Sequence, residues 1–382
     1  MRYLLIMKVH LQERLGVPNN LIDTANRFYF DLIEEVSREV KASNRKEDYY
    51  FYIKPEPPYT LGEYQITSMK VNMKIIPNEN STKVEFISMS VTSVLGKPKE
   101  YLHKGKITFN IKSPVYSITI VAPENFTRED IINYFTENKK ELLPPIAHEF
   151  KHIYDEEKKE YEVYSDRSQY IAGRELMDID LEELKLLGYY IYFTHGIEAL
   201  VRPSEILAYL TENKISKKEF LNFLNDNKTY ETLKDINKFS VNEMRETLKK
   251  NHMDEVNKYL EKNSSRYRKE FSDDKKLDLL FAEWYMKYVE TDATFYQNLI
   301  TDGPFESLFG LPENKLKALQ RHVDRLGRFA KKPLEYFDYI ENYLKVISGE
   351  TLKKIAKLYD FLEDEENEET TLQKKISSRS KR

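Results

Sequence analysis

Hydrophobic and polar residues alternate along this chain with two different periods. Between residues 20 and 41 the apolar positions recur every three or four residues, which predicts an amphipathic helix. From about residue 48 to residue 122 the period is two, which is typical of half-buried strands. The clearest strand segments are 69–75, 84–95, 107–111 and 116–120. The pattern therefore predicts one long helix followed by a meander of four or five strands.

Beyond Pro123 the helical period returns. Thr127, followed three residues later by Asp130, resembles a capping box and predicts a helix over 128–139. From about residue 174 the pattern is helical almost to the end. We expect breaks at prolines and glycines, namely at Pro144-Pro145, Gly188, Gly196, Pro203, Pro304, Pro312 and Pro333.

These patterns favour an α+β fold, with an N-terminal helix plus a small mixed or antiparallel sheet and an all-α C-terminal region. They divide the chain into an α+β region (1–125), a helical core (126–215), a helical domain (216–362) and a charged tail (363–382). The tail combines an acidic run with the basic end KKISSRSKR, so we expect it to be disordered.

The composition narrows the chemistry that the chain can perform. It has no cysteine and seven histidines, so a metal ion would have to be held by His, Asp or Glu. The net charge of −4 argues against nucleic acid as a partner. No stretch reaches the roughly 20 apolar residues of a membrane span, and the apolar run at Tyr3–Met7 is too short for a signal peptide. We therefore expect a cytoplasmic protein with no membrane partner.

Two of the seven histidines lie four residues apart in the sequence PPIAHEFKH, residues 144 to 152. If a helix begins near Pro145, His148 and His152 point to the same side and can share one metal ion. Glu149 is offset by one residue, where it can act as general base on a water. Apolar neighbours such as Phe150 and Ile153 would make two histidines and a glutamate costly without a partner. The pattern H-E-x-x-H thus predicts a Zn²⁺ site.

With this motif after a strand-rich region, the sequence resembles the zincin metallopeptidases over roughly residues 100 to 210. The resemblance implies a zincin-like core in 126–215, in which a helix after the H-E-x-x-H helix brings the third ligand. The metzincin pattern is excluded because Lys158 stands where its third histidine belongs. The gluzincin pattern takes a glutamate instead.

Two glutamates compete for that role in THGIEALVRPSEILAYL, residues 194 to 210. Glu205 is our first choice, because Pro203 fits the first turn of a helix and P-S-E-I-L-A resembles the third-ligand segment of phage-encoded H-E-x-x-H proteins. Glu198 is the alternative ligand, or a carboxylate that orients one histidine. Tyr209 departs from thermolysin-like enzymes, which have Asp at that position.

Three further kinds of residue are candidates for supporting roles. Asp155 follows His152 by three residues on the same side of the predicted helix, and His195 precedes the third-ligand segment. Either side chain could hydrogen-bond to a metal-binding residue without touching the metal, and either could instead have a purely structural role. Tyr189, Tyr190 or Tyr192 could donate a hydrogen bond to an oxyanion.

The sequence thus leads to two hypotheses of different classes. The first is a zinc-dependent endopeptidase, phage-encoded and acting in the host cytoplasm on a protein or peptide. In this hypothesis Glu149 activates the attacking water. The second is a non-catalytic phage or virion protein with a zincin-like domain, whose C-terminal helices bind a phage or host protein. Glu149 favours the enzyme, because a structural metal site needs no base.

Overall fold

The chain folds into two compact units, which are described one at a time in this computed structural model. Unit 1 comprises the described parts of residues 1–158, 200–225 and 354–382, and unit 2 those of 159–199 and 226–353. The structure describes residues 17–18, 20–43, 47–62, 64–92, 99–103, 106–111, 114–158, 173–174, 176–177, 179–301, 328–329 and 332–362. The predicted tail at 363–382 lies outside these residues, as do Pro304 and Pro312.

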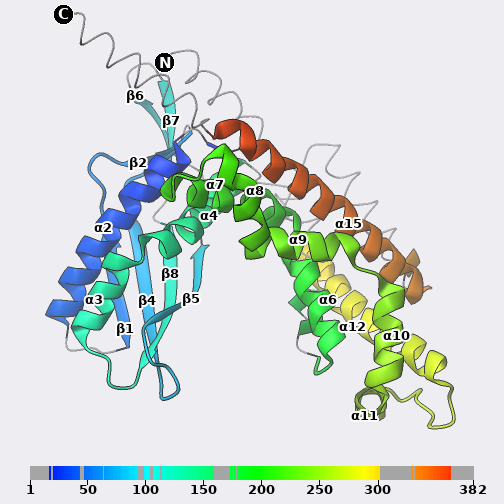
Figure 1. Ribbon diagram of the computed structural model, residues 1–382. Coiled ribbons are helices and arrows are strands. Elements are labelled where there is room, and N and C mark those ends of the chain that lie inside the picture. The colour runs from blue at the N-terminus through cyan, green and yellow to red at the C-terminus, as the bar shows by residue number, and fades with distance from the viewer. Residues whose placement is uncertain are drawn as a thin grey trace, which may run out of the picture. The chain divides into compact units, whose positions relative to one another are not determined.

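The fold is α+β, as the sequence pattern predicts, with a long helix before the strands and helices after them (Figure 1). Residues up to 158 form α2 (Leu21–Ala42), β1 (Asp48–Ile53), β2 (Tyr59–Leu61), β3 (Tyr64–Ile66), β4 (Met69–Asn78), β5 (Glu85–Thr92), β6 (Lys99–His103), β7 (Lys106–Ile111), β8 (Val115–Pro123), α3 (Arg128–Glu137) and α4 (Lys139–Lys158). The later elements are α6 (Glu182–Phe193), α7 (Gly196–Glu212), α8 (Lys217–Asp226), α9 (Lys228–Lys238), α10 (Val241–Asn251), α11 (Met253–Asn263), α12 (Asp273–Thr301), α15 (Pro333–Ala356) and the 3₁₀ turn η1 (Lys357–Phe361).

The strands of unit 1 form two four-stranded sheets, with the orders β1-β4-β8-β5 and β2-β3-β7-β6. The predicted meander is wrong, because β8 lies between β4 and β5, parallel to β4 and antiparallel to β5. Burial explains this order. Tyr116, Ile118 and Ile120 of β8 are almost completely buried, which suits a central strand, whereas β5 buries no residue and forms an edge.

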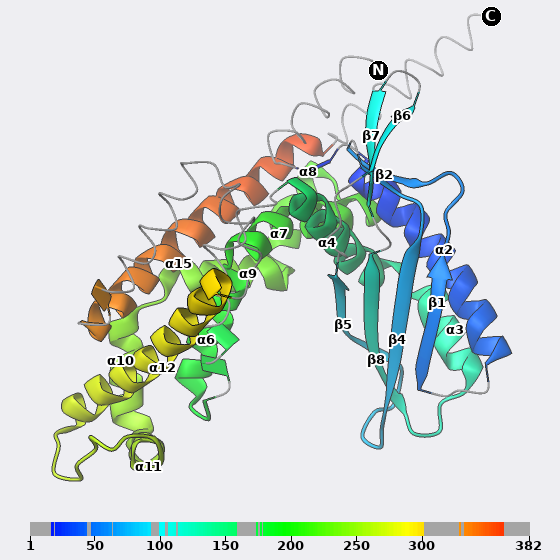
Figure 2. The ribbon, with the colours of Figure 1, turned by 180° about the vertical axis from the view of Figure 1, so that it is seen from behind.

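Helices α2, α3 and α4 line one face of the larger sheet, and both views show α2 and α3 on the same side (Figures 1 and 2). An aromatic cluster joins these layers. The Phe150 ring of α4 lies 5.2 Å from Phe28 of α2, 5.9 Å from Tyr59 of β2 and 6.4 Å from Tyr116 of β8. Because all four side chains are buried, they determine where α4 lies against the sheet.

The predicted capping box is confirmed at the start of α3, where Thr127 and Asp130 exchange hydrogen bonds. The expected proline breaks are wrong at three places. Pro144 and Pro145 lie inside α4, and Pro203 lies inside α7, which begins seven residues earlier at Gly196. An interior proline costs about 3 kcal/mol. Burial of neighbours offsets this cost: Leu142, Leu143, Ile146, Val201 and Ile206 are at most 1% exposed.

Gly188 also does not end a helix, because it lies in the middle of α6. A methyl group built on Gly188 would lie 2.5 Å from the carbonyl oxygen of Gly173 and 2.8 Å from Cβ of Leu176. Glycine is therefore required here by the close approach of another backbone segment within unit 2.

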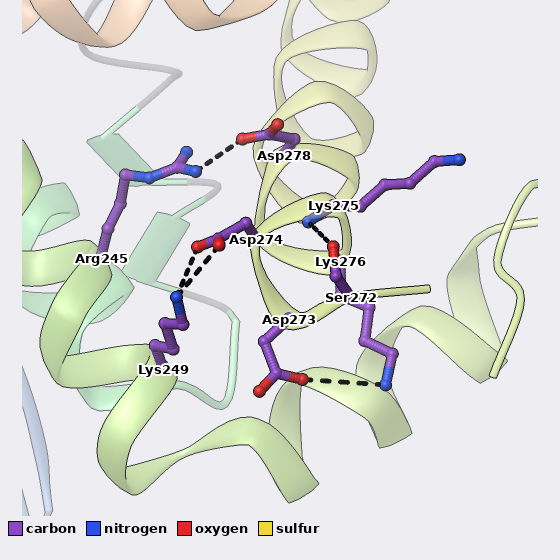
Figure 3. Close-up of polar contacts among 8 residues, drawn as sticks. All are labelled: Arg245, Lys249, Ser272, Asp273, Asp274, Lys275, Lys276 and Asp278. Carbon is purple, nitrogen blue, oxygen red and sulfur yellow. Dashed lines mark hydrogen bonds and ion pairs between the residues drawn. The ribbon is translucent and has the colours of Figure 1, made fainter. Parts of the chain in front are cut away.

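Unit 2 is helical in its described part and has an aromatic core. Trp284 and Phe281 of α12 pack on Phe337 of α15, with ring centroids 5.4 and 4.5 Å apart. The Arg245 guanidinium of α10 lies over the Phe281 ring, 5.2 Å from its centroid, and ion pairs also join α10 to α12 (Figure 3). Arg245 and Lys249 of α10 form ion pairs with Asp278 and Asp274 of α12, at 2.6 and 2.9 Å. In the described part of the chain, no helix is both long and apolar enough to cross a bilayer.

Candidate metal centre

His148 and His152 lie one turn apart on α4, as the motif predicts. The helix is anchored by Phe150 on the opposite side, so the two histidines and Glu149 are held at its other faces. His148 and Glu149 are each 8% exposed, and His152 is half-buried. The two Nε2 atoms are 3.0 Å apart. Nitrogen ligands of a tetrahedral zinc ion are roughly 3.3 Å apart, since each lies about 2.0–2.1 Å from the metal. The two nitrogens are therefore close enough to bind one ion together.

Glu198, in the first turn of α7, joins the two histidines. One ligand atom from each of His148, His152 and Glu198 lies within 4.8 Å of the other two. This group could hold a metal ion, and two imidazoles with one carboxylate are the ligand set of many catalytic zinc sites. A soft metal such as Cu(I) would favour sulfur ligands, which the group lacks.

Glu205, also on α7, lies on the other side of His148. Its Oε2 is 3.4 Å from Nδ1 of His148 and 3.1 Å from Nη1 of Arg202. Burial alone would raise the pKa of Glu205, but the hydrogen bond from His148 and the charge of Arg202 lower it to about 2. Glu205 is therefore ionised at neutral pH and contacts the nitrogen of His148 that does not face His152. The sequence favoured it as the third ligand, whereas the structure places it outside the group of possible ligands.

Glu149 is held by the edge strand of the larger sheet. Its Oε2 accepts a hydrogen bond of 2.9 Å from the backbone N–H of Val91 on β5. Burial, followed by the charge of Glu149, raises the pKa of the Tyr116 phenol of β8. The sequence did not indicate Val91, since a backbone donor leaves no signal in residue type. This contact brings the carboxylate, the two histidines and an exposed strand together.

Asp155 was a candidate for a supporting role beside the metal, and its partner in the structure is Lys151. Its two carboxylate oxygens lie 2.6 and 2.5 Å from Nζ of Lys151, one turn earlier on α4. Lys151 and Asp155 are 2% and 7% exposed, so this is a buried ion pair within α4. Lys151 was not among the predicted residues, although its spacing of four residues from Asp155 was a usable signal.

The remaining candidates lie outside the group of possible ligands. His195 is 6% exposed, and its backbone N–H donates to the carbonyl of Tyr192 just before α7. Tyr190 packs edge-on against Phe239 at 5.6 Å, and burial, followed by the charge of Asp235, raises its pKa. Tyr189 is 40% exposed and contacts Phe193. Supporting roles for these residues stay predictions.

The geometry of the centre is thus a pair of facing imidazoles, a nearby carboxylate and a second carboxylate behind His148. The chemistry available is metal binding next to a buried, oriented base. Comparison of the chain with protein-family models, with curated proteins and with solved structures found no match.

Proposed function

We propose that this protein is a zinc-dependent endopeptidase with His148, His152 and Glu198 as ligands and Glu149 as general base. The observation that carries the proposal is the combination of the facing Nε2 atoms with Glu149 on the same turn of α4. A structural zinc site is usually closed by four protein ligands, whereas a catalytic site keeps one position open. Three protein ligands with the neighbouring Glu149 carboxylate fit a catalytic zinc site. The zincin resemblance of the sequence supports the same assignment.

Each residue would have a defined part in peptide hydrolysis. When bound, Zn²⁺ supplies a Lewis acid that polarises a carbonyl and lowers the pKa of water. Glu149 would take a proton from the attacking water while the water oxygen bonds to the peptide carbon. It would then deliver this proton to the nitrogen as the C–N bond breaks. The Val91 amide would keep the Glu149 carboxylate in the required orientation.

Glu205 would act through His148 rather than on the substrate. A carboxylate on the outer nitrogen of a metal-binding histidine fixes its tautomer and ring orientation. The hydrogen bond from Nδ1–H of His148 and the charge of Arg202 together keep Glu205 ionised. Glu198, which was the alternative in the sequence-based prediction, is thus the proposed third ligand. Glu205, which was the first choice, is the proposed orienting group.

The peptide substrate would pair with the outer edge of β5. This strand pairs only with β8 among the described residues, and most of its residues are exposed. Since Val91 directs its N–H away from β8, the backbone groups of Met89, two residues earlier, face the same outer edge. A peptide extended along this edge would pass beside Glu149.

The first test is the metal content of the purified protein and of single variants, measured by mass spectrometry. We expect about one zinc per chain in the wild type, with loss in His148→Ala and Glu198→Ala. Glu205→Ala should still bind zinc, with an affinity about 10–100-fold lower. Glu149→Gln should keep zinc and lose about 10²–10⁴-fold of casein cleavage.

Other results would change the assignment in defined ways. Zinc retained by Glu198→Ala and lost from Glu205→Ala would make Glu205 the third ligand, as first predicted from the sequence. Zinc binding with no cleavage of any protein would favour the alternative of a non-catalytic phage or virion protein. Wild-type protein that takes up no zinc would overturn the enzyme proposal.

A further inference from the structure

A pocket of about 470 Å³ lies in unit 2, where α6 meets the end of α9 and the start of α10 (Figure 1). Sites for small molecules have volumes of roughly 300–1,000 Å³, so this pocket suits a small ligand or a single side chain. α6 lines it with one face, since Glu183, Leu186 and Tyr190 follow each other at helical spacing. None of the lining residues is a proposed zinc ligand or base, so the pocket is independent of the endopeptidase proposal.

Tyr190 provides the feature that points to a ligand. The residue is 8% exposed, and its hydroxyl forms no hydrogen bond within the described part of the chain. The oxygen is nevertheless not sealed from solvent, so a molecule in the pocket can reach it. The two other described hydroxyls in the lining are used within α10, because Ser240 accepts from the N–H of Glu243 and Thr247 donates to its carbonyl. Burial, followed by the charge of Asp235, raises the pKa of the Tyr190 phenol, so this hydroxyl stays neutral.

Carboxylates outnumber cations around the pocket. Its described lining contains one lysine, Lys238, and three carboxylates, from Glu183, Asp235 and Glu243. Glu183 already has a partner, because its Oε1 lies 3.1 Å from Nε2 of His252. Asp235 and Glu243 are exposed and form no ion pair within the described part of the chain. Two carboxylates are therefore available to a cationic group, and a neutral hydroxyl in the same pocket can accept its N–H.

The rest of the lining is apolar. Leu186 of α6 is 45% exposed, and Met244 of α10 is 5% exposed. Phe239, between α9 and α10, packs edge-on against Tyr190 with the ring centroids 5.6 Å apart. Hydrocarbon placed against these side chains would leave water, which favours the binding of an apolar body. The pocket thus combines an apolar wall with a few polar groups, which is the usual composition of a small-ligand site.

We propose that this pocket binds a primary ammonium group carried on an apolar chain or ring. We call it the amine pocket and define it by Leu186, Tyr190, Asp235, Phe239, Glu243 and Met244. The ammonium donates a hydrogen bond to the hydroxyl of Tyr190 and is attracted by the two available carboxylates. The hydrocarbon part packs on the apolar side chains. Free amines and the lysine side chains of other proteins both carry such a group, and binding experiments distinguish these two sources.

The first probe is phenethylamine, and its neutral match is 2-phenylethanol, which has the same ring and chain. Both are titrated with the full-length protein near neutral pH in EDTA, which removes any zinc that an amine could bind, and saturation-transfer NMR measures Kd. We expect the amine to bind about tenfold more tightly, because its charge adds two partly exposed ion contacts and strengthens one hydrogen bond. The preference should weaken as salt is raised. Equal binding of the two compounds by the wild type would overturn the inference.

Two variants test whether the amine pocket is responsible. Tyr190→Phe removes the hydroxyl and keeps the ring, and we expect it to weaken phenethylamine binding about fivefold. Asp235→Asn removes one exposed charge and should weaken it about threefold. The matched control is Tyr189→Phe, which alters a neighbouring tyrosine that is 40% exposed and does not line the pocket, and it should keep the wild-type affinity. Unchanged affinity in both test variants, or an equal loss in the control, would contradict the proposal.

The source of the ammonium group is tested with Nα-acetyl-lysine methylamide, whose single amine is the side chain. If it binds as tightly as phenethylamine and is weakened equally by Tyr190→Phe, the pocket is a site for a lysine side chain of another protein. If phenethylamine binds and the lysine compound does not, the pocket is a site for free amines. If neither compound binds to the wild type, the amine pocket is refuted, whatever the zinc content and cleavage activity of the protein.

Discussion

The two units differ in whether buried titratable side chains are concentrated on one helix. In unit 1, four titratable side chains within eight residues of α4 are buried: His148, Glu149, Lys151 and Asp155. In unit 2, the core around Trp284 is aromatic, and the ion pair of Lys249 with Asp274, between α10 and α12, is exposed (Figure 3). Burying charge is costly unless each group has a partner, so a fold dispenses with it where only stability is at stake. The concentration of buried polar groups on α4 is therefore the feature from which we propose a function for this helix.

The largest effect should come from breaking the buried pair of unit 1. Asp155→Ala leaves the buried ammonium of Lys151 without its carboxylate, and we expect a loss of about 3–5 kcal/mol in the free energy of unfolding. Urea unfolding followed by circular dichroism measures it. The matched control is Asp274→Ala, which removes the partner of half-exposed Lys249 in unit 2 and should cost at most about 1 kcal/mol. Similar losses in both variants would contradict the contrast between the units.

Zinc should stabilise α4, which carries both histidines of the proposed site. At a free zinc concentration of 100 times Kd, we expect about 2.7 kcal/mol of additional protection in α4, because only the folded site binds the ion. Hydrogen exchange of peptides from α4 measures this. Trp284 is the single tryptophan of the chain, so its fluorescence reports on unit 2 alone. A zinc-dependent shift of the Trp284 unfolding transition without a change in α4 would refute the assignment of the metal site.

A smaller effect tests the backbone packing of unit 2. Gly188→Ala should cost about 1–3 kcal/mol, because the new methyl group meets the carbonyl oxygen of Gly173 at 2.5 Å. Gly349→Ala in α15 is the control: its methyl group would meet only Nδ2 of Asn237, at 3.7 Å. This helical substitution should stabilise by up to about 1 kcal/mol. Trp284 fluorescence during urea unfolding follows both variants, and a neutral Gly188→Ala would show that the contact is relaxed.

Features that depend on neighbours in the sequence were predictable. The helix at 21–42 follows from its apolar spacing, and the start of α3 follows from Thr127 and Asp130. The two histidines share a side of α4 because residues four apart do so in any helix. The start of α4 was placed too late, since its prolines are tolerated for reasons of burial that local rules do not include.

Features that depend on distant parts of the chain were decided only by the tertiary structure. Glu198 and Glu205 lie seven residues apart on one helix, two turns along the same side, so their spacing does not separate a ligand from an orienting group. Which of the two glutamates lies with the histidine pair depends on which turn of α7 faces each nitrogen of His148. The edge position of β5 likewise follows from the insertion of β8 into the sheet, which brings Val91 to Glu149. The sequence by itself determined that two histidines and a glutamate lie together on one helix, in the pattern H-E-x-x-H. Packing determined that Glu198 lies near both histidines and that β5 lies beside Glu149, because both are contacts between residues more than 40 positions apart.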